Sequence, residues 1–367
     1  MTPFVPDDLP LRNLDFGQLI GLVGEANAAL ARYDGMLQGV VNPSVLLSPL
    51  TTQEAVLSSK IEGTQATLDE VLEAEAGQVF DEGKTQDIQE VVNYRRALML
   101  ASEALRDQPL TLGLVKQMHG VLLDSVRGQH KEPGQFRRDQ NWIGPKGCAI
   151  EEATFVPPSP LQLLDHLEAW QCYLAGEDVD RLIQVAVMHA QFELIHPFKD
   201  GNGRIGRLLV PLFLFNKGAL AQPMFYLSAY LEQHRDEYYA RLRGISEAGE
   251  WNEWIAFFLR AIQVQAVDNT DRVRRMLGLY EEMKERIREI THSQYSIQLL
   301  DALFDRPIFQ TSDAVQRTGL TKQSLMALLR QLKEAQILIP LREASGRRAA
   351  ILAFPALLNI AEGREIL

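Results

Sequence analysis

The chain has 367 residues, 46% of them apolar, and a formal net charge of −11. This length is enough for two or three domains, and the acidic balance excludes a protein that is basic throughout and binds nucleic acid by overall charge. The two cysteines, the lack of a signal-peptide pattern and the lack of an apolar run near the roughly 20 residues of a membrane-spanning helix favour a cytoplasmic protein without disulfides or a membrane partner.

Apolar residues at helical spacing dominate the first part of the chain. Those that precede Gly63 share one helix face, and a glycine at this point is typical of a helix end. Thr67 and Glu70 have the spacing of a capping box, in which each side chain bonds the backbone amide of the other residue. The helices predicted here are 53–62, 67–76, 86–106 and 111–124.

Residues 128–158 differ from the rest, because they are rich in glycine and proline and contain only short β-prone pieces. This composition predicts a loop or small hairpin on a helical body. Ser159 and Pro160 then have the pattern of a helix start, with a capping side chain followed by proline at the first helical position. We expect that helix to run to about residue 175.

Residues 179–195 are apolar almost all round, which predicts a buried helix. Pro197 disfavours helical backbone at His196 and should end the helix there. A second apolar helix is expected from about Gly203 to Gly218. The helices predicted after it are 231–248, 252–267 and 270–290.

The last part of the chain has the element order of a winged-helix domain. The predicted elements are helices 296–304, 311–317 and 321–335, a turn at Gly319, and β-prone pieces 337–341 and 349–354. Residues 291–367 hold nine Lys and Arg against seven Asp and Glu, a net charge of +2, which leaves −13 for the remainder. The cations lie mainly on helix 321–335 and at Arg342, Arg347 and Arg348. DNA binding and contacts with proteins, including dimer formation, both stay open for this domain.

The densest polar segment is 196–207, which joins the two apolar helices and reads HPFKDGNGRIGR. Gly201 and Gly203 let the backbone approach a ligand closely, and the amides that open the next helix form an anion site. Arg204 and Arg207 are three residues apart, so they share a helix face, and their guanidinium groups suit phosphates.

The same segment supplies a candidate metal ligand and a candidate base. Asp200 offers hard carboxylate oxygens, which suit Mg²⁺ that bridges phosphates. His196 titrates near neutrality and can accept a proton from a hydroxyl. A base, a metal ligand and an anion cradle together indicate phosphoryl or nucleotidyl transfer.

Other interpretations of this region are weaker. The three glycines of residues 201–206 have the spacing of a dinucleotide-binding fingerprint, but that motif follows a strand, and here a helix precedes it. The chain contains no P-loop pattern. A merely solvated turn would not need so many glycines and cations between apolar helices. We interpret His189, on the preceding helix, as a buried packing residue.

The segment HPFKDGNGRIGR resembles the Fic family signature, HPFx[DE]GNGRxxR, at every defining position. The resemblance implies a helical protein that transfers AMP from ATP to a Ser, Thr or Tyr hydroxyl of a target protein. It implies that His196 is the base, that Asp200 holds Mg²⁺ against the phosphates, and that Phe198 packs under the loop. The implied ATP-binding residues are Gly201, Asn202, Gly203, Arg204 (β-phosphate), Ile205, Gly206 and Arg207 (γ-phosphate).

A second motif, SSKIEG at residues 58–63, is similar to the inhibitory motif of the family, [ST]xxxE[GN]. Ser58 and Glu62 are four residues apart, and Gly63 completes the pattern. The resemblance implies that Glu62 pairs with Arg207 and so occupies the arginine meant for the γ-phosphate. Because the motif precedes the loop, the chain resembles the class with an N-terminal inhibitory helix.

Two further segments resemble family elements. Gly134 and Arg137, with the hairpin-like residues 139–156 that include Trp142 and Ile143, are similar to a flap that docks the target by adding a strand beside it. The pair Tyr238 and Tyr239 is similar to tyrosines that border the adenine and ribose.

These observations predict an all-α fold with a Fic-type core, a small hairpin flap and a C-terminal winged helix. The expected domains are 1–105 with the inhibitory helix, 106–290 as the catalytic core and 291–367 as the winged helix. The expected function is that of a protein adenylyltransferase held in check by Glu62, with ATP and Mg²⁺ as cofactors and a homodimer as its assembly. Two alternatives remain: removal of AMP at the same site, and a DNA-binding regulator whose core senses nucleotide.

Overall fold

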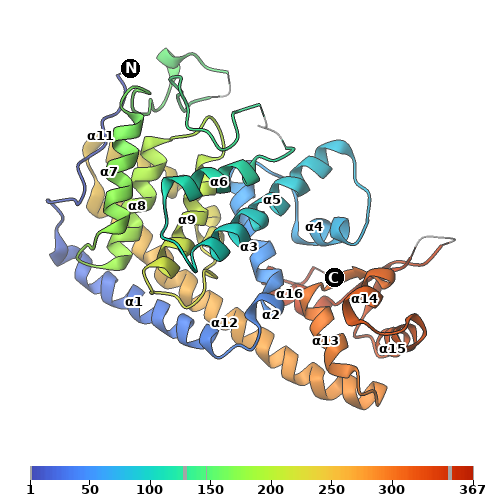
Figure 1. Ribbon diagram of the computed structural model, residues 1–367. Coiled ribbons are helices and arrows are strands. Elements are labelled where there is room, and N and C mark those ends of the chain that lie inside the picture. The colour runs from blue at the N-terminus through green and yellow to red at the C-terminus, as the bar shows by residue number, and fades with distance from the viewer. Residues whose placement is uncertain (1, 127–129, 146, 346–348, 367) are drawn as a thin grey trace. The chain divides into compact units, whose positions relative to one another are not determined.

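The computed structural model describes residues 2–126, 130–145, 147–345 and 349–366, and these are mostly helical, as predicted (Figure 1). The chain divides into two compact units that are each discontinuous in sequence. The first unit contains Met1–Gly35, Leu57–Gly63 and Val92–Val267, and the second contains Met36–Val56, Thr64–Val91 and Asp268–Leu367. The three contiguous domains expected from the sequence remain a prediction.

Two apolar helices, α8 (Arg181–Ile195) and α9 (Asn202–Asn216), pack against each other in the core of the first unit. Nearly every side chain of both helices is buried, as their apolar sequence predicts. Three helices pack against this pair: α6 (Leu112–Leu122), α7 (Leu163–Ala175) and α11 (Arg235–Ala248). The same unit also contains α10 (Ser228–Gln233) and a 3₁₀ turn, Ile150–Glu152. The loop that joins α8 to α9 is therefore held at both ends by buried helices.

Four long helices contribute residues to both units. They are α1 (Phe16–Gln38), α3 (Ser48–Ile61), α5 (Glu82–Ala104) and α12 (Trp251–Thr291). The sequence predicted two helices, 252–267 and 270–290, where the structure has the single helix α12. No glycine or proline lies between the two predicted segments, so nothing in the backbone interrupts the helix.

The start of α7 was also predicted wrongly. Ser159 and Pro160 do not begin the helix but form a turn, in which the amides of Gln162 and Leu163 donate to carbonyls three residues earlier. The helix begins only at Leu163. By contrast, the capping box of Thr67 and Glu70 is present at the start of α4, as predicted.

The second unit combines short helices with a three-stranded antiparallel sheet in the order β1-β3-β2. Its elements are α2 (Pro43–Leu46), α4 (Leu68–Glu75), α13 (Ser296–Asp305), β1 (Ile308–Gln310), α14 (Thr311–Thr318), α15 (Lys322–Glu334), β2 (Ile339–Arg342), β3 (Ile351–Ala353) and α16 (Pro355–Glu362). In the register, Phe309 faces Leu352 across β1 and β3, and Pro340 faces Leu352 across β2 and β3. The helices and strands predicted after residue 295 are therefore present, whereas the winged-helix assignment stays a prediction.

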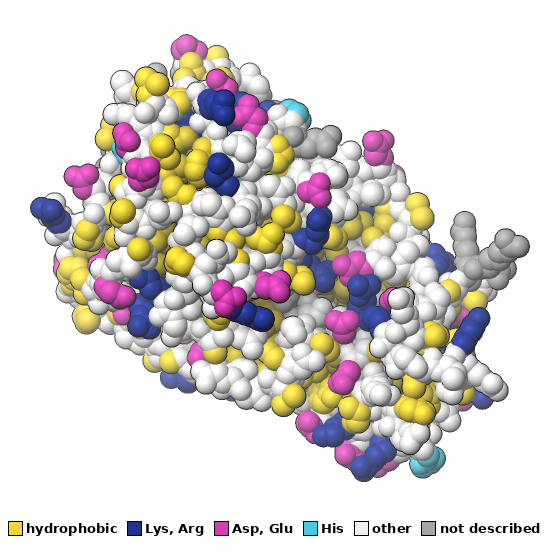
Figure 2. Space-filling view, viewed as in Figure 1, with side chains coloured by type: hydrophobic (Ala, Val, Ile, Leu, Met, Phe, Trp, Pro, Cys, Tyr) yellow, Lys and Arg dark blue, Asp and Glu magenta, His cyan; other side chains and the backbone are white. Residues whose placement is uncertain are grey.

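The cationic surface expected near the end of the chain is only partly described. Arg347 and Arg348 lie outside the described residues. Arg342 bonds the side-chain oxygen of Gln78 at 3.0 Å and the carbonyl of Ala349 at 3.3 Å, within the second unit. Figure 2 shows acidic and basic side chains interspersed over the visible face. No helix in the described parts of the chain has the length and hydropathy to cross a bilayer.

Candidate active site

The loop between α8 and α9 is fixed by its own polar atoms. His196 ends α8 in a left-handed conformation, with φ 49° and ψ 61°, immediately before Pro197. Gly201, also left-handed at φ 76°, leads into α9. The side chain of Asn202 closes the loop, because its oxygen accepts from the amide of Phe198 at 2.8 Å and its nitrogen donates to the carbonyl of Phe198 at 2.9 Å.

The His196 ring has a defined donor and acceptor. Its Nδ1 lies 3.2 Å from the carbonyl oxygen of Glu193, and because a carbonyl only accepts, Nδ1 carries the hydrogen. The other nitrogen, Nε2, is then an acceptor, and the ring lines a cavity of about 790 Å³. Burial lowers the pKa of His196 to about 4, so the imidazole is neutral at neutral pH. A neutral imidazole with a free lone pair can take a proton from a hydroxyl.

Arg137, expected in the flap, instead supports the backbone of this loop. It is buried, and its Nε donates to the carbonyl of His196 at 3.0 Å. Its other nitrogens donate to the carbonyls of Asp139, Pro158 and Ile195. A guanidinium that is buried among four carbonyls presents no docking surface of its own.

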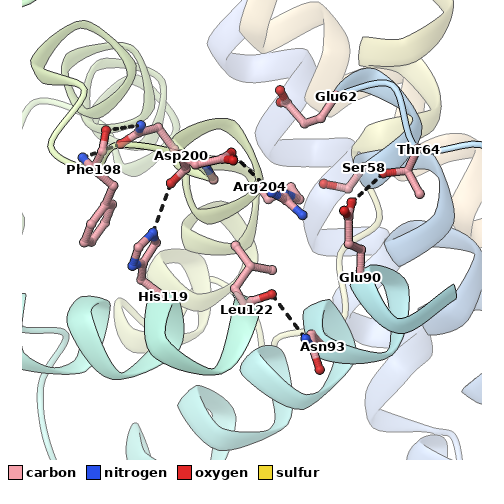
Figure 3. Close-up of polar contacts among 12 residues, drawn as sticks. Ser58, Glu62, Thr64, Glu90, Asn93, His119, Leu122, Phe198, Asp200 and Arg204 are labelled. Atoms are coloured by element: carbon pink, nitrogen blue, oxygen red, sulfur yellow. Dashed lines mark hydrogen bonds and ion pairs between the residues drawn. The ribbon is translucent and has the colours of Figure 1, made fainter. Parts of the chain in front are cut away.

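His119, on α6, was missed by the sequence reasoning. Its Nε2 lies 3.0 Å from the carbonyl of Asp200, so Nε2 donates, and Nδ1 accepts from the amide of Gly134 at 2.8 Å. The ring stacks on Phe198 with centroids 3.7 Å apart and planes within 6°. Figure 3 shows His119 reaching from α6 to the backbone of Asp200. The only sequence signal was a histidine on the apolar face of an amphipathic helix.

The predicted inhibitory residues meet the second arginine of the loop. Arg207 Nη2 lies 2.7 Å from Glu62 Oε1, and Arg207 also donates to Ser58, from Nε to Oγ and from Nη2 to the carbonyl, both at 2.9 Å. Burial alone would raise the pKa of Glu62, but the charge and hydrogen bond of Arg207 outweigh it, so this pKa lies below its usual value. Gly203 makes this approach possible, because a Cβ there would come within 2.2 Å of Glu62 Oε1.

Arg204, the first arginine of the loop, pairs with a residue of the same loop. Arg204 is buried, and its Nη2 lies 3.5 Å from Asp200 Oδ1 (Figure 3). The same oxygen also accepts from the amide of Gly201 at 2.6 Å. The two arginines are therefore held differently: Arg204 pairs with Asp200 in the loop before α9, and Arg207 pairs with Glu62 at the end of α3.

Within the loop sequence 196–207, Asp200 is the one residue that supplies carboxylate oxygens of the kind that Mg²⁺ prefers. Its side chain is 42% exposed, and no group of three or more His, Cys, Asp or Glu residues capable of holding a metal occurs in the described ranges. A single carboxylate fits Mg²⁺, which is commonly held by one or two carboxylates together with substrate phosphates.

Both polar and apolar residues line the cavity beside His196. Glu62, Gly203 and Arg207 line it near the N-terminus of α9, where backbone amides favour anions. The predicted tyrosines line it too: Tyr238 is buried and its hydroxyl bonds His189 Nε2 at 2.9 Å, whereas Tyr239 is 38% exposed.

The remaining predicted residues divide between the cavity, where the flap residues lie, and the core, where the rest of the loop packs. Trp142 and Ile143 line the cavity, each 41% exposed, and Ile143 forms an antiparallel bridge with Phe155. Ile205 is fully buried, so its side chain packs in the core. The carbonyl of Gly206 accepts from His189 Nδ1 at 3.0 Å, which confirms His189 as a buried packing histidine.

The sequence matches two family models. Residues 20–103 match the model described as Fic/DOC family N-terminal, and residues 109–214 match the model described as Fic/DOC family. Two curated relatives are protein adenylyltransferase fic-1 of Caenorhabditis briggsae, 26% identical over 195 residues, and protein adenylyltransferase Fic of Aedes aegypti, 30% identical over 151 residues. These alignments cover 50% and 40% of this chain but only 34% and 27% of the relatives, so the chain aligns with about a third of their length.

Solved structures share the fold over most of the chain. A Fic family protein from Desulfovibrio desulfuricans G20 superposes with a TM-score of 0.60 at 20% identity, covering 96% of this chain and 98% of that protein. A segment of Fic-1 from C. elegans superposes with a TM-score of 0.51 at 20% identity, covering 72% of this chain and 73% of that one.

Proposed function

Because the chain belongs to the Fic/DOC family, we propose that it is a protein adenylyltransferase, which transfers AMP from ATP to a Ser, Thr or Tyr hydroxyl of a target protein or of itself. One observation carries the proposal: the neutral His196, whose Nδ1 bonds the carbonyl of Glu193 and whose Nε2 is left as an acceptor, lines a cavity together with Gly203 of the first turn of α9 and Arg207. The relatives named protein adenylyltransferase support it.

In the proposed reaction, His196 Nε2 takes the proton of the target hydroxyl as its oxygen attacks the α-phosphorus. The bond from that phosphorus to the oxygen bridging to the β-phosphate breaks, and pyrophosphate leaves. The amides of residues 201–203 and the guanidinium of Arg204 hold the phosphates, with Arg207 assigned to the γ-phosphate. Asp200 would hold Mg²⁺, which, when bound, neutralises phosphate charge.

We propose that Glu62 restrains this activity. Its carboxylate and Ser58 already take three hydrogen bonds from Arg207, so the γ-phosphate must compete for that guanidinium. Without the arginine, the triphosphate settles in a pose in which the α-phosphorus is not aligned for attack. The exposed Trp142 and Ile143 would dock the target through backbone pairing beside the bridge to Phe155.

The test is labelling with ATP that carries a tag on the α-phosphate. The Glu62→Gly variant should label itself or proteins of a lysate more strongly than the wild-type chain. The absence of label from both forms would refute the adenylyltransferase assignment. If Glu62 instead orients a water that removes AMP, Glu62→Gly should lose the ability to remove AMP from a premodified target, which is the opposite outcome.

A further inference from the structure

Glu193 is a carboxyl group at the cavity whose hydrogen-bonding capacity the proposed mechanism leaves unused. It lies on α8 three residues before His196, and its side chain lines the same cavity. Its Oε1 is enclosed and has no hydrogen-bond partner among the described residues. A carboxyl oxygen without a partner is costly, and Oε1 is closed off as the side chain lies, so this oxygen would gain a partner if the carboxyl turned toward a ligand hydroxyl in the cavity.

The position of this carboxyl depends on Gly206. A Cβ at residue 206 would come within 2.1 Å of Glu193 Oε1, closer than any side chain tolerates. The glycine therefore lets the carboxyl lie directly against α9, one residue before Arg207. Any other residue at 206 would push the carboxyl out of this place.

Glu193 lines the cavity together with Arg207 and Glu62 and with Tyr238 and Tyr239. Its Oε1 and His189 Cε1 both lie beside Gly206, within 2.1 and 3.3 Å of a Cβ built there, and His189 Nε2 bonds the hydroxyl of Tyr238 at 2.9 Å. The carboxyl therefore lies next to Arg207 along α9 and close to the residue that holds Tyr238. In a nucleotide, the ribose lies between the phosphates and the base. A nucleotide with its phosphates at Arg207 and its base at the tyrosines therefore brings its sugar to Glu193.

The chemistry of a carboxyl suits the two hydroxyls of ribose. In dinucleotide sites an acidic side chain accepts from the ribose hydroxyl in the same way. Burial raises the pKa of Glu193 to about 8, and the neutral acid still has a carbonyl oxygen that accepts from a hydroxyl. The hydrogen bond from a ribose hydroxyl to Glu193 can therefore form whether the carboxyl is charged or neutral.

We propose that Glu193 is a specificity residue that hydrogen-bonds the ribose hydroxyls of the bound nucleotide and so selects ribonucleotides over deoxyribonucleotides. This inference rests on the proposed function only in that a nucleotide must occupy the cavity.

The test measures the dissociation constants of ATP, 2′-deoxy-ATP and 3′-deoxy-ATP by calorimetry. His196→Ala serves as the parent, because it should bind nucleotide without turning it over. We expect at least one deoxynucleotide to bind the parent roughly tenfold more weakly than ATP, because it lacks one hydrogen bond to a buried group. When Glu193→Leu, or the smaller Glu193→Ala, is added to this parent, the dissociation constants of the three nucleotides should become nearly equal.

Two further variants separate recognition from general disturbance. Glu193→Gln keeps an accepting oxygen and should retain the preference for ribose. Glu237→Gln, on α11, removes a carboxylate that pairs with Arg241 at 3.2 Å and does not line this cavity, so the preference should be unchanged. Equal binding of all three nucleotides to the parent, or a preference that survives Glu193→Leu and Glu193→Ala, would overturn the inference. Failure of ATP to bind the parent at all would instead count against the proposed function.

Discussion

The loop of residues 196–207 and the flap of residues 139–156 border the same cavity but are held in different ways. In the loop, Asn202 closes the backbone, His119 and Arg137 hold it from outside, and Glu62 holds Arg207. In the described part of the flap, one bridge joins Ile143 to Phe155, and the side chains of Trp142 and Ile143 are exposed.

This difference separates two tasks. The nucleotide side is preorganised, because groups that act on developing charge gain most when they need no rearrangement. The target side leaves its backbone and apolar side chains available to a partner whose sequence it does not read. Substitutions in the loop should therefore change catalysis, whereas substitutions in the flap should change recognition of the target.

The largest effect is expected from His196→Ala, which removes the proposed base from the loop. Labelling by the Glu62→Gly form should fall by about 10³-fold, the usual contribution of a general base. ATP binding should persist, as measured by calorimetry, because the phosphate contacts come from other residues. Substantial labelling in this variant would show that another group takes the proton.

The next largest effect is expected from the loss of Glu62, which should increase labelling. Glu62→Gly should raise labelling by roughly 10- to 100-fold, because it frees Arg207 from a charged hydrogen bond. Ser58→Ala removes only the hydroxyl contact and leaves the carbonyl of Ser58 bonded to Arg207, so a smaller rise is expected. If Ser58→Ala matched Glu62→Gly, the charge of the glutamate would not be the restraint.

The pH dependence tests the state of the base. A histidine accepts a proton only when neutral, and burial lowers the pKa of His196 to about 4. The kcat/KM of Glu62→Gly should therefore stay level from neutral pH down to about pH 5 and be lost as the pH falls through about 4. An acid limb near the ordinary histidine pKa of about 6.5 would contradict the buried, neutral ring.

Substitutions of His119 test whether a residue outside the loop holds the loop backbone in place. Gln can accept from Gly134 and donate to Asp200, whereas Phe keeps the stacking on Phe198 and loses both bonds. We expect His119→Phe to lose roughly tenfold in kcat and His119→Gln to lose much less, in line with one or two hydrogen bonds. Equal losses would mean that the stacked ring, and not its nitrogens, positions the loop.

The smallest effect is expected in the flap. Trp142→Ala removes an exposed ring whose Nε1 bonds the carbonyl of Cys148 at 3.0 Å. The KM for a protein target should rise by only a few-fold, as for most partly exposed contact residues. The affinity for ATP, measured by calorimetry, should not change, and a loss there would place Trp142 on the nucleotide side.

The sequence alone predicted the mostly helical fold, the buried helix that ends at His196, and a loop with the residue types of an anion site. These features are local: apolar periodicity, Pro197 and closely spaced glycines fix them wherever the rest of the chain lies. The sequence could not distinguish one long α12 from two helices, because continuity depends on packing along the whole length.

Apart from the pairing of Glu62 with Arg207, 145 positions away, which the resemblance implied, only the tertiary structure decided which residues meet in space. It brought His119 and Arg137 to the loop. It also placed Glu193 against Gly206 and brought Glu193 and the tyrosines together at one cavity. Spacing along one helix reports neighbours three or four residues apart, whereas contacts between helices depend on how their faces pack, which no local pattern contains.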